Sequence, residues 1–209
     1  MMVAAHQYDL SAAKTQGLRT AFVARSTEPP PNTPNPAFDI NVTTYGELVD
    51  ELGAGPPTLH EDCLGVQPDA IQVQHLSSGW TVVDGSELLL DFGPSAADAD
   101  RAKDVISFYD LDRICYVARP NPPMMYFTVK GHAPAGPMPG EDAIAFDLNR
   151  IHAEQSADGW IVTDGVSRLL DFGPSRFNAL HAVTVIRNYG FTHQCFVGRP
   201  HAPMMYFRK

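Results

Sequence analysis

The sequence predicts an α+β protein made of two tandem β-β-β-α-β-β modules packed with pseudo-twofold symmetry, preceded by a shorter α/β segment. Three observations support this fold class: a repeat at a fixed spacing, a change of hydrophobic period inside each copy, and a different pattern in the first quarter of the chain. The chain has 209 residues, of which 44% are hydrophobic, and this is enough to bury more than one core. We therefore expect a globular protein with several folded units.

The repeat covers most of the chain. Residues 71–127 align without a gap with residues 151–207, and 27 of the 57 aligned positions are identical. The segment CYVARPNPPMMYF, which begins at Cys115, returns as CFVGRPHAPMMYF from Cys195. We interpret the repeat as a tandem duplication. The expected boundaries are a linker at 54–65, the first module at 66–129, a linker rich in proline and glycine at 130–145, and the second module at 146–209.

Each copy contains strand signals followed by a helix signal. In the first copy, runs of branched and aromatic residues at 71–76, 80–83 and 87–92 are separated by tight-turn residues, which indicates three strands. Apolar residues then recur at helical spacing up to Tyr109, and Ser95 can cap the start of this helix. The segments RICYVAR and PMMYFTV indicate two more strands. One helix covers one face of such a sheet, so we expect the other copy to cover the remaining surface.

The net charge of −9 argues against nucleic acid or an anionic membrane as a partner, because neither is attracted to a negative surface. No apolar run is long enough to cross a bilayer, and the N-terminus lacks the pattern of a signal peptide, so we expect a cytoplasmic protein by default. Cys63, Cys115 and Cys195 have no metal-ligand spacing, and the histidines form no cluster, so we expect neither a metal site nor a cofactor. Free thiols are the favoured interpretation; a Cys115–Cys195 disulfide is the alternative.

Two tryptophans, Trp80 and Trp160, stand at equivalent positions of the two copies. Their neighbours alternate as in a half-buried strand, so core packing is the favoured interpretation. The alternative is that each indole is a platform on which a sugar ring stacks.

Two arginines, Arg119 and Arg199, are also repeated. The favoured interpretation is an ion pair inside each copy, Arg119 with Asp91 and Arg199 with Asp171. The alternative is a ligand-binding pair, because a guanidinium on an extended bend can bind a carboxylate, a phosphate or sugar hydroxyls.

Residues 1–53 do not belong to the repeat. The segment MMVAAHQYDLSAAKTQGLRTAFVAR indicates a buried strand, a short helix ended by Gly17 and a second strand, the pattern of a parallel sheet. A proline-rich loop and a strand around FDINV follow. A further helix is expected to begin at Thr44, with Glu47 completing a capping box, and to end at Gly53. We predict a partial Rossmann-like α/β fragment.

Over these fifty or so residues, the segments VAAHQYDL, GLRTAFVAR and STE resemble the C-terminal end of haloacid dehalogenase-superfamily hydrolases, particularly the type II 2-haloacid dehalogenases. The resemblance implies that Asp9 is the acidic residue of the fourth motif at the end of a strand, where it positions a catalytic lysine or water, or holds magnesium in the phosphatase branch. His6 and Ala4 stand where the dehalogenases place asparagine and serine. The nucleophilic aspartate, the second-motif hydroxyl residue and the third-motif lysine have no counterparts. We expect Asp9 to be catalytic only if residues outside this chain complete the site, and we favour truncation or gene remodelling over a minimal dehalogenase.

Three functional hypotheses follow from these features. The first is a non-catalytic tandem-repeat protein that binds a protein partner or self-associates and carries a dehalogenase-like remnant. The second is the C-terminal portion of a haloacid dehalogenase-like hydrolase acting on a small 2-haloacid or phosphate substrate. The third is a carbohydrate-binding or small-ligand-binding module that uses Trp80, Trp160, Arg119 and Arg199.

Overall fold

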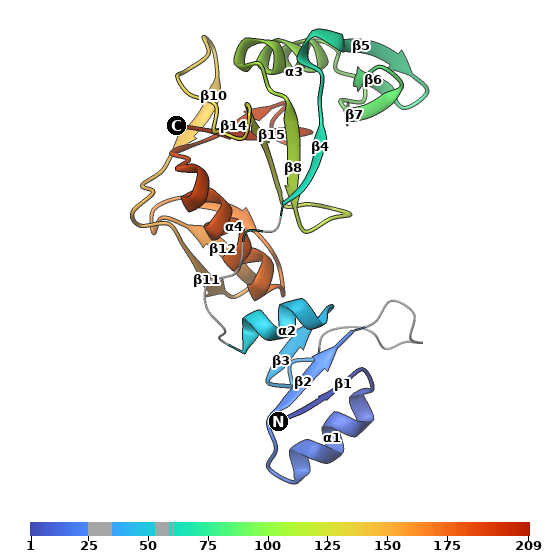
Figure 1. Cartoon of the computed structure of the whole chain (residues 1–209), viewed down its shortest axis with the longest axis vertical. Helices are drawn as coiled ribbons and strands as arrows, with labels where there is room; N and C mark the ends of the chain where they lie inside the picture. The colour runs from blue at the N-terminus through green and yellow to red at the C-terminus, as the bar shows by residue number, and fades with distance from the viewer. Residues whose placement is uncertain (25–34, 53–58, 60) are drawn as a thin grey trace.

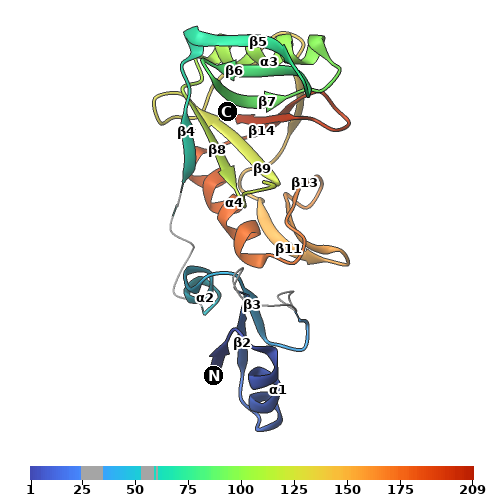
Figure 2. The same cartoon turned by 90° about the vertical axis from the view of Figure 1, so that its right-hand side faces the viewer.

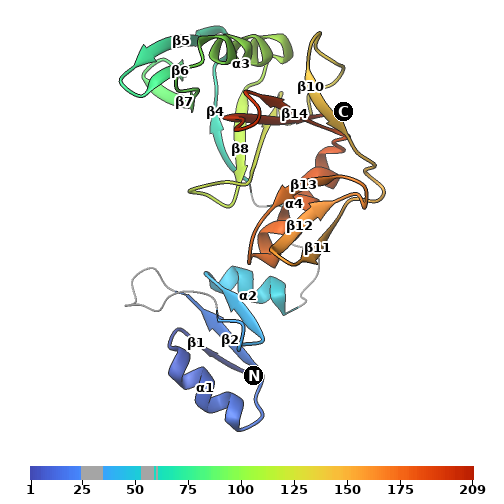
Figure 3. The same cartoon turned by 180° about the vertical axis from the view of Figure 1, so that it is seen from behind.

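The computed structural model describes residues 1–24, 35–52, 59 and 61–209, and it shows a mixed α+β protein. Figure 1 shows three regions along the long axis: the N-terminal segment in blue and cyan at one end, residues 71–109 of the first repeat unit in green at the other, and residues 152–189 of the second repeat unit in orange and red between them. The views in Figures 2 and 3 show the same order. The N-terminal segment therefore lies beside the second unit, although the first unit follows it in the sequence.

The N-terminal segment is a three-stranded parallel sheet with two helices, as the sequence predicts. Its elements are β1 (Met2–Ala4), α1 (Gln7–Thr15), β2 (Thr20–Val23), β3 (Ile40–Val42) and α2 (Tyr45–Glu51). The central strand β2 pairs with β1 on one side and β3 on the other. The capping box is confirmed, because the Glu47 amide donates to the Thr44 hydroxyl at 3.1 Å and the Thr44 amide donates to the Glu47 carboxylate at 3.3 Å. Gly53 and most of the proline-rich loop lie outside the described residues.

The two repeated stretches contain the same strands and the same α-helix in the same order, and the first also has a short 3₁₀ helix. The first holds β4 (Asp62–Gly65), a short 3₁₀ helix (Pro68–Ala70), β5 (Ile71–Leu76), β6 (Gly79–Asp84), β7 (Glu87–Asp91), α3 (Ala96–Tyr109), β8 (Arg113–Val117) and β9 (Met124–Thr128). The second holds β10 (Asp142–Ala145), β11 (His152–Ser156), β12 (Gly159–Thr163), β13 (Arg168–Asp171), α4 (Arg176–Tyr189), β14 (His193–Val197) and β15 (Met204–Arg208). The five strands and one helix predicted for each copy are confirmed.

Two further strands correct the predicted boundaries. β4 lies in the segment 54–65 and β10 in the segment 130–145, both of which were expected to be linkers. Each unit is therefore β-β-β-β-α-β-β, with its first strand ahead of the block that aligns. The strands of each unit form two antiparallel sheets: β5-β6-β7 and β4-β8-β9 in the first, β11-β12-β13 and β10-β14-β15 in the second.

Each of the two large apolar cores contains side chains from both units. The core around α3 receives four buried side chains from β14 and β15, namely Cys195, Val197, Met204 and Tyr206. The core around α4 receives their four equivalents from β8 and β9, namely Cys115, Val117, Met124 and Tyr126. Neighbouring strand residues point to opposite faces, so Ile114 and Phe127 remain in the core of their own unit. Each β8-β9 or β14-β15 pair thus contributes one face to its own unit and the other face to its partner unit.

The helices of the described residues are short. The longest two, α3 and α4, each have 14 residues. No helix in this part of the chain is both long and apolar enough to cross a membrane.

Candidate functional site

A cleft of about 460 Å³ lies between the N-terminal segment and the second unit. One wall is formed by β3, the residues before it and the end of α2; the other is formed by β11, β12 and the start of α4. Its lining residues are Pro36, Asp39, Ile40, Asn41, Glu51, Gln155, Gly159, Trp160, Pro174 and Arg176. Of the residues selected from the sequence, the structure brings Trp160 alone into this cleft.

Trp160 lies at the start of β12 and is held there by the turn that leads into α4. The Trp160 amide donates to the Gly173 carbonyl at 2.6 Å, and the Trp160 carbonyl accepts from the Phe172 amide at 2.8 Å. Gly159 must be glycine here: its φ is 133°, and a Cβ at this position would lie 2.2 Å from the Gly173 oxygen. The indole is half-buried and packs against the core of its unit. This agrees with the favoured interpretation, and part of the ring still faces the cleft.

Arg176 is the first residue of α4 and joins the two walls of the cleft. Its guanidinium lies 5.5 Å from the centre of the Trp160 ring and forms an ion pair with Glu51 at 2.9 Å. The Glu51 side chain is 14% exposed, so the pair is partly shielded from water. The cleft therefore contains an aromatic face, a guanidinium and a carboxylate within a small volume.

Asp39 provides a second carboxylate in the cleft. It accepts hydrogen bonds from the Thr20 amide at 2.7 Å and the Thr20 hydroxyl at 3.0 Å. Both bonds lower the pKa of Asp39 below its ordinary value, and the bond from the Thr20 amide has the larger effect. Asp39 is therefore ionised at neutral pH and can accept hydrogen bonds from a ligand.

Trp80, the equivalent of Trp160, lies in a different environment. It is half-buried against the core of the first unit, and His75 contacts it edge-on with ring centres 5.0 Å apart. Ala96 stands where the second unit has Arg176, and the N-terminal segment lies beside the other unit. The two tryptophans thus occupy equivalent positions in their units, but only Trp160 lines the cleft.

Arg119 and Arg199 each form an ion pair, but not with the predicted partner. Arg119 lies 3.1 Å from Asp62 and Arg199 lies 2.8 Å from Asp142. Each guanidinium also stacks on an aromatic ring of the strand that precedes it, 4.2 Å from the centre of Tyr116 on β8 and 4.0 Å from the centre of Phe196 on β14. The predicted partners were wrong because the acids that face these arginines come from the unpredicted strands β4 and β10. Neither arginine lines the cleft.

Asp91 and Asp171 stabilise turns. Each accepts a hydrogen bond from the amide two residues later, Gly93 at 2.8 Å and Gly173 at 2.9 Å. This backbone bond is the main cause that lowers the pKa of both carboxyls. The repeated DFGPS segments therefore end a strand and begin a helix, with Ser95 and its equivalent capping the helix.

Asp9 lies in the first turn of α1, five residues after the end of β1, rather than at the end of the strand. It is half-buried and hydrogen-bonds the neighbouring Tyr8 hydroxyl, which raises the pKa of that tyrosine. Asp9 does not line the cleft. The structure therefore separates this residue from Trp160 and from both arginines.

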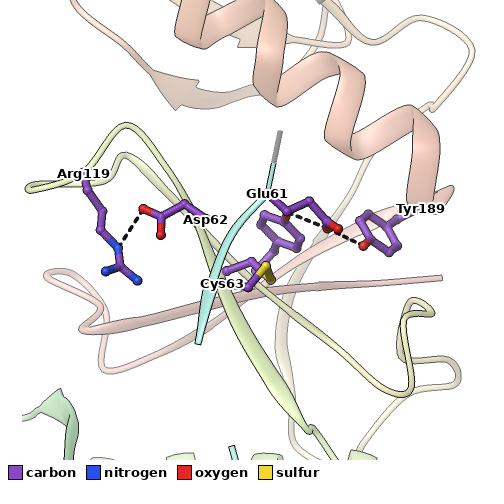
Figure 4. Close-up of a disulfide and its surroundings, with 7 residues drawn as sticks. Glu61, Asp62, Cys63, Arg119 and Tyr189 are labelled. Atoms are coloured by element: carbon purple, nitrogen blue, oxygen red, sulfur yellow. Dashed lines mark hydrogen bonds and ion pairs between the residues drawn. A yellow bond between two sulfur atoms is a disulfide. The ribbon is translucent and has the colours of Figure 1, made fainter. Parts of the chain in front are cut away.

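Two carboxylates that were not predicted as site residues, Glu61 and Glu141, join the units. Glu61 accepts hydrogen bonds from Tyr126 of its own unit, at 3.1 Å, and from Tyr189 on the helix of the second unit (Figure 4). Eighty residues later, Glu141 accepts from Tyr206 of its own unit and from Tyr109 on the helix of the first unit, both at 2.8 Å. The signal that could have found them is the pair Glu-Asp at 61–62, which returns at 141–142 ahead of the aligned block.

The two clusters differ in charge. Glu141 forms an ion pair with Arg208 at 2.6 Å, whereas the residue equivalent to Arg208 is Thr128. Burial alone would raise the pKa of Glu141, but the hydrogen bonds from Tyr206, Arg208 and Tyr109 outweigh burial, and the pKa is lowered. Burial and the Glu61 carboxylate raise the pKa of Tyr189 to about 12, so this hydroxyl stays a donor.

The cysteines form a pair that was not predicted. Cys63 on β4 and Cys115 on β8 are directly opposite each other and form a disulfide, whereas Cys195 is a free, buried thiol. The expectation of three free thiols and the alternative Cys115–Cys195 pairing were both wrong. Burial raises the pKa of Cys195 to about 12, which keeps the thiol protonated.

Comparison of the chain with protein-family models, with curated proteins and with solved structures finds no match.

Proposed function

We propose that the chain is a non-catalytic binding protein in which the two repeat units, related by a pseudo-twofold axis, form one scaffold and hold a small-ligand cleft against the N-terminal segment. The reciprocal exchange of four core side chains supports the pseudo-twofold relation. The reciprocal bonds of Glu61 and Glu141 to a tyrosine of the other unit support it as well. Neither unit has a complete core without its partner.

The observation that carries the binding role is the difference between repeated and unrepeated residues. The repeated Arg119 and Arg199 make scaffold contacts in both units. In contrast, the polar side chains that the second unit places in the cleft are unrepeated, since Gln155 and Arg176 replace His75 and Ala96. The cleft is thus an addition to the scaffold.

The ligand class that fits the cleft is a carbohydrate or a similar polyhydroxylated molecule. Sugar rings stack an apolar face on an indole, and Trp160 offers one. Carboxylates accept from hydroxyls, while amides and a guanidinium donate to ring and hydroxyl oxygens. Asp39, Gln155 and Arg176 line the cleft and supply these groups. This combination of groups is typical of small-ligand sites, in which a few polar side chains surround an aromatic surface.

The test is a titration of the full chain with a panel of neutral and acidic hexoses and their disaccharides. Binding is measured by tryptophan fluorescence and by calorimetry. We expect one saturable site, weakened at least tenfold by Arg176→Ala and by Trp160→Ala. Arg176→Ala introduces the residue type that Ala96 already provides at the same helix position, so the fold should tolerate it. Trp80→Ala is the matched control and should leave the affinity unchanged. Absence of saturable binding, or an equal loss in Trp80→Ala, would contradict the proposal.

The hydrolase hypothesis has a separate readout. The parallel β1-β2-β3 sheet is compatible with the dehalogenase-like origin of residues 1–53. Release of halide from 2-chloropropionate by the full chain, with its loss in Asp9→Asn, would support that alternative over a binding protein.

A further inference from the structure

We propose that Glu61, Cys63 and Cys115 bind a thiophilic divalent cation such as Zn²⁺ when the disulfide between the two cysteines is reduced. A carboxylate oxygen of Glu61 and the two sulfur atoms all lie within 4.8 Å of one another. Two thiolates and a carboxylate form a donor set that suits zinc, with a water molecule as the fourth ligand. This site is separate from the cleft and does not depend on it.

The strand geometry brings the three ligands to one face. Cys63 on β4 is directly opposite Cys115 on β8 in the antiparallel register. Glu61 stands two residues before Cys63 in extended chain, and side chains two residues apart point to the same face. Figure 4 shows Asp62, between them, pointing to the other side toward Arg119, while Glu61 points toward Tyr189.

The proposed zinc site is open to solvent on the side of Glu61, and two tyrosines orient the Glu61 side chain. Cys115 is buried, Cys63 is half-buried and Glu61 is exposed, so an ion can enter from solvent. The hydroxyls of Tyr126 and Tyr189 donate to the Glu61 carboxylate and fix its orientation. Outer hydrogen bonds of this kind orient metal ligands and strengthen binding.

The redox state decides whether the ligands are available. A dithiol reductant transfers two electrons and two protons to the Cys63–Cys115 disulfide, which yields two protein thiols and a disulfide in the reductant. Zn²⁺ binding then displaces the two thiol protons to water, so the affinity should rise with pH. In the oxidised protein both sulfurs are bonded to each other and provide no thiolate.

The second unit offers a natural comparison. Ala143 stands where the first unit has Cys63, and Cys195 is the equivalent of Cys115. Glu141 forms an ion pair with Arg208, so its carboxylate already has a cationic partner. The variant Cys63→Ala therefore gives the first unit a residue that the same fold already carries in the second.

The experiment uses the full chain, reduced with dithiothreitol, desalted without oxygen and titrated with zinc chloride against a chromophoric chelator. We expect one Zn²⁺ per chain, with affinity at least tenfold lower in Cys63→Ala and unchanged in Cys195→Ala. Glu61→Gln should weaken binding less than Cys63→Ala. With Co²⁺, the reduced protein should show thiolate-to-cobalt charge-transfer absorption that is absent from Cys63→Ala.

Three results would overturn the proposal. The first is the lack of stoichiometric Zn²⁺ binding by the reduced, folded chain. The second is equal affinity in Cys63→Ala, which would place the ion elsewhere. The third is equal affinity of the oxidised protein, in which the thiolates are absent.

Discussion

At the scale of single residues, Glu61 and Glu141 occupy equivalent positions but stabilise the protein by different interactions. Both accept hydrogen bonds from a tyrosine of each unit. Glu141 also neutralises Arg208, and the two side chains are 4% and 8% exposed. A buried charge that loses its partner costs more than a lost neutral hydrogen bond, so the two glutamates should differ in their effect on stability.

We expect Glu141→Gln to lower the free energy of unfolding by about 3 kcal/mol or more, because Arg208 is left buried without a counter-ion. Glu61→Gln is the matched control and should cost about 1 kcal/mol, since it changes hydrogen bonds at an exposed carboxylate. Urea unfolding at neutral pH measures both. Equal losses in the two variants would contradict the assignment of a special role to the ion pair.

The ion pair between Glu141 and Arg208 also makes the free energy of unfolding depend on pH. The folded pKa of Glu141 is lower than its unfolded value, so its contribution is complete above the unfolded pKa and is lost as the pH falls through the folded pKa. The stability difference between the natural chain and Glu141→Gln should therefore shrink in acid. If the stability difference between the two proteins stayed constant until the protein unfolds in acid, the ionised Glu141 carboxylate would not be the source of the pH dependence.

Local patterns predicted the residues of the turns but not the partners of the ion pairs. The repeated Arg119 and Arg199 were expected to pair with Asp91 and Asp171, but their partners are Asp62 and Asp142. Which acid faces an arginine depends on which strand pairs with β8 or β14, and that long-range pairing leaves no trace in the sequence around the arginine. The same limitation concealed the Cys63–Cys115 pair.

At the scale of secondary structure, the sequence predicted the elements with clear periodic patterns and missed two short strands, β4 and β10. The helices α3 and α4, with their serine caps, and the three-stranded β5-β6-β7 hairpins have clear periods and turn residues. β4 and β10 have four residues each and follow segments rich in proline and glycine. Four residues are too few for an alternating pattern to stand out.

The disulfide fixes β4 to β8 and joins two cysteines that are 52 positions apart in the sequence. Loop closure restricts the unfolded chain, so reduction should lower the free energy of unfolding by about 2–4 kcal/mol. Urea unfolding with and without a reductant, in the absence of metal, measures this. Cys63→Ala should match the reduced protein and should not respond to the reductant. A natural chain equally insensitive to the reductant would contradict the stabilising role of the bond.

At the scale of the whole molecule, each of the two large apolar cores contains side chains from both units. Met204 of the second unit lies in the first core, and Met124 of the first unit lies in the second core, both fully buried. The sequence predicted that the copies would cover each other, but the depth of the exchange depends on strand faces that only the folded structure reveals. The position of the N-terminal segment beside the second unit was not predictable either, because Arg176 and Glu51 are 125 residues apart.

Native-state hydrogen exchange in Met204→Ala, with Met124→Ala as its mirror variant, tests whether the two cores are shared between the units. Removal of a buried methionine costs about 2–5 kcal/mol. Because the cores are shared, Met204→Ala should lower amide protection in α3 of the first unit, and Met124→Ala should lower it in α4 of the second. Protection lost only within the unit that carries each substitution would contradict the shared cores and the single scaffold.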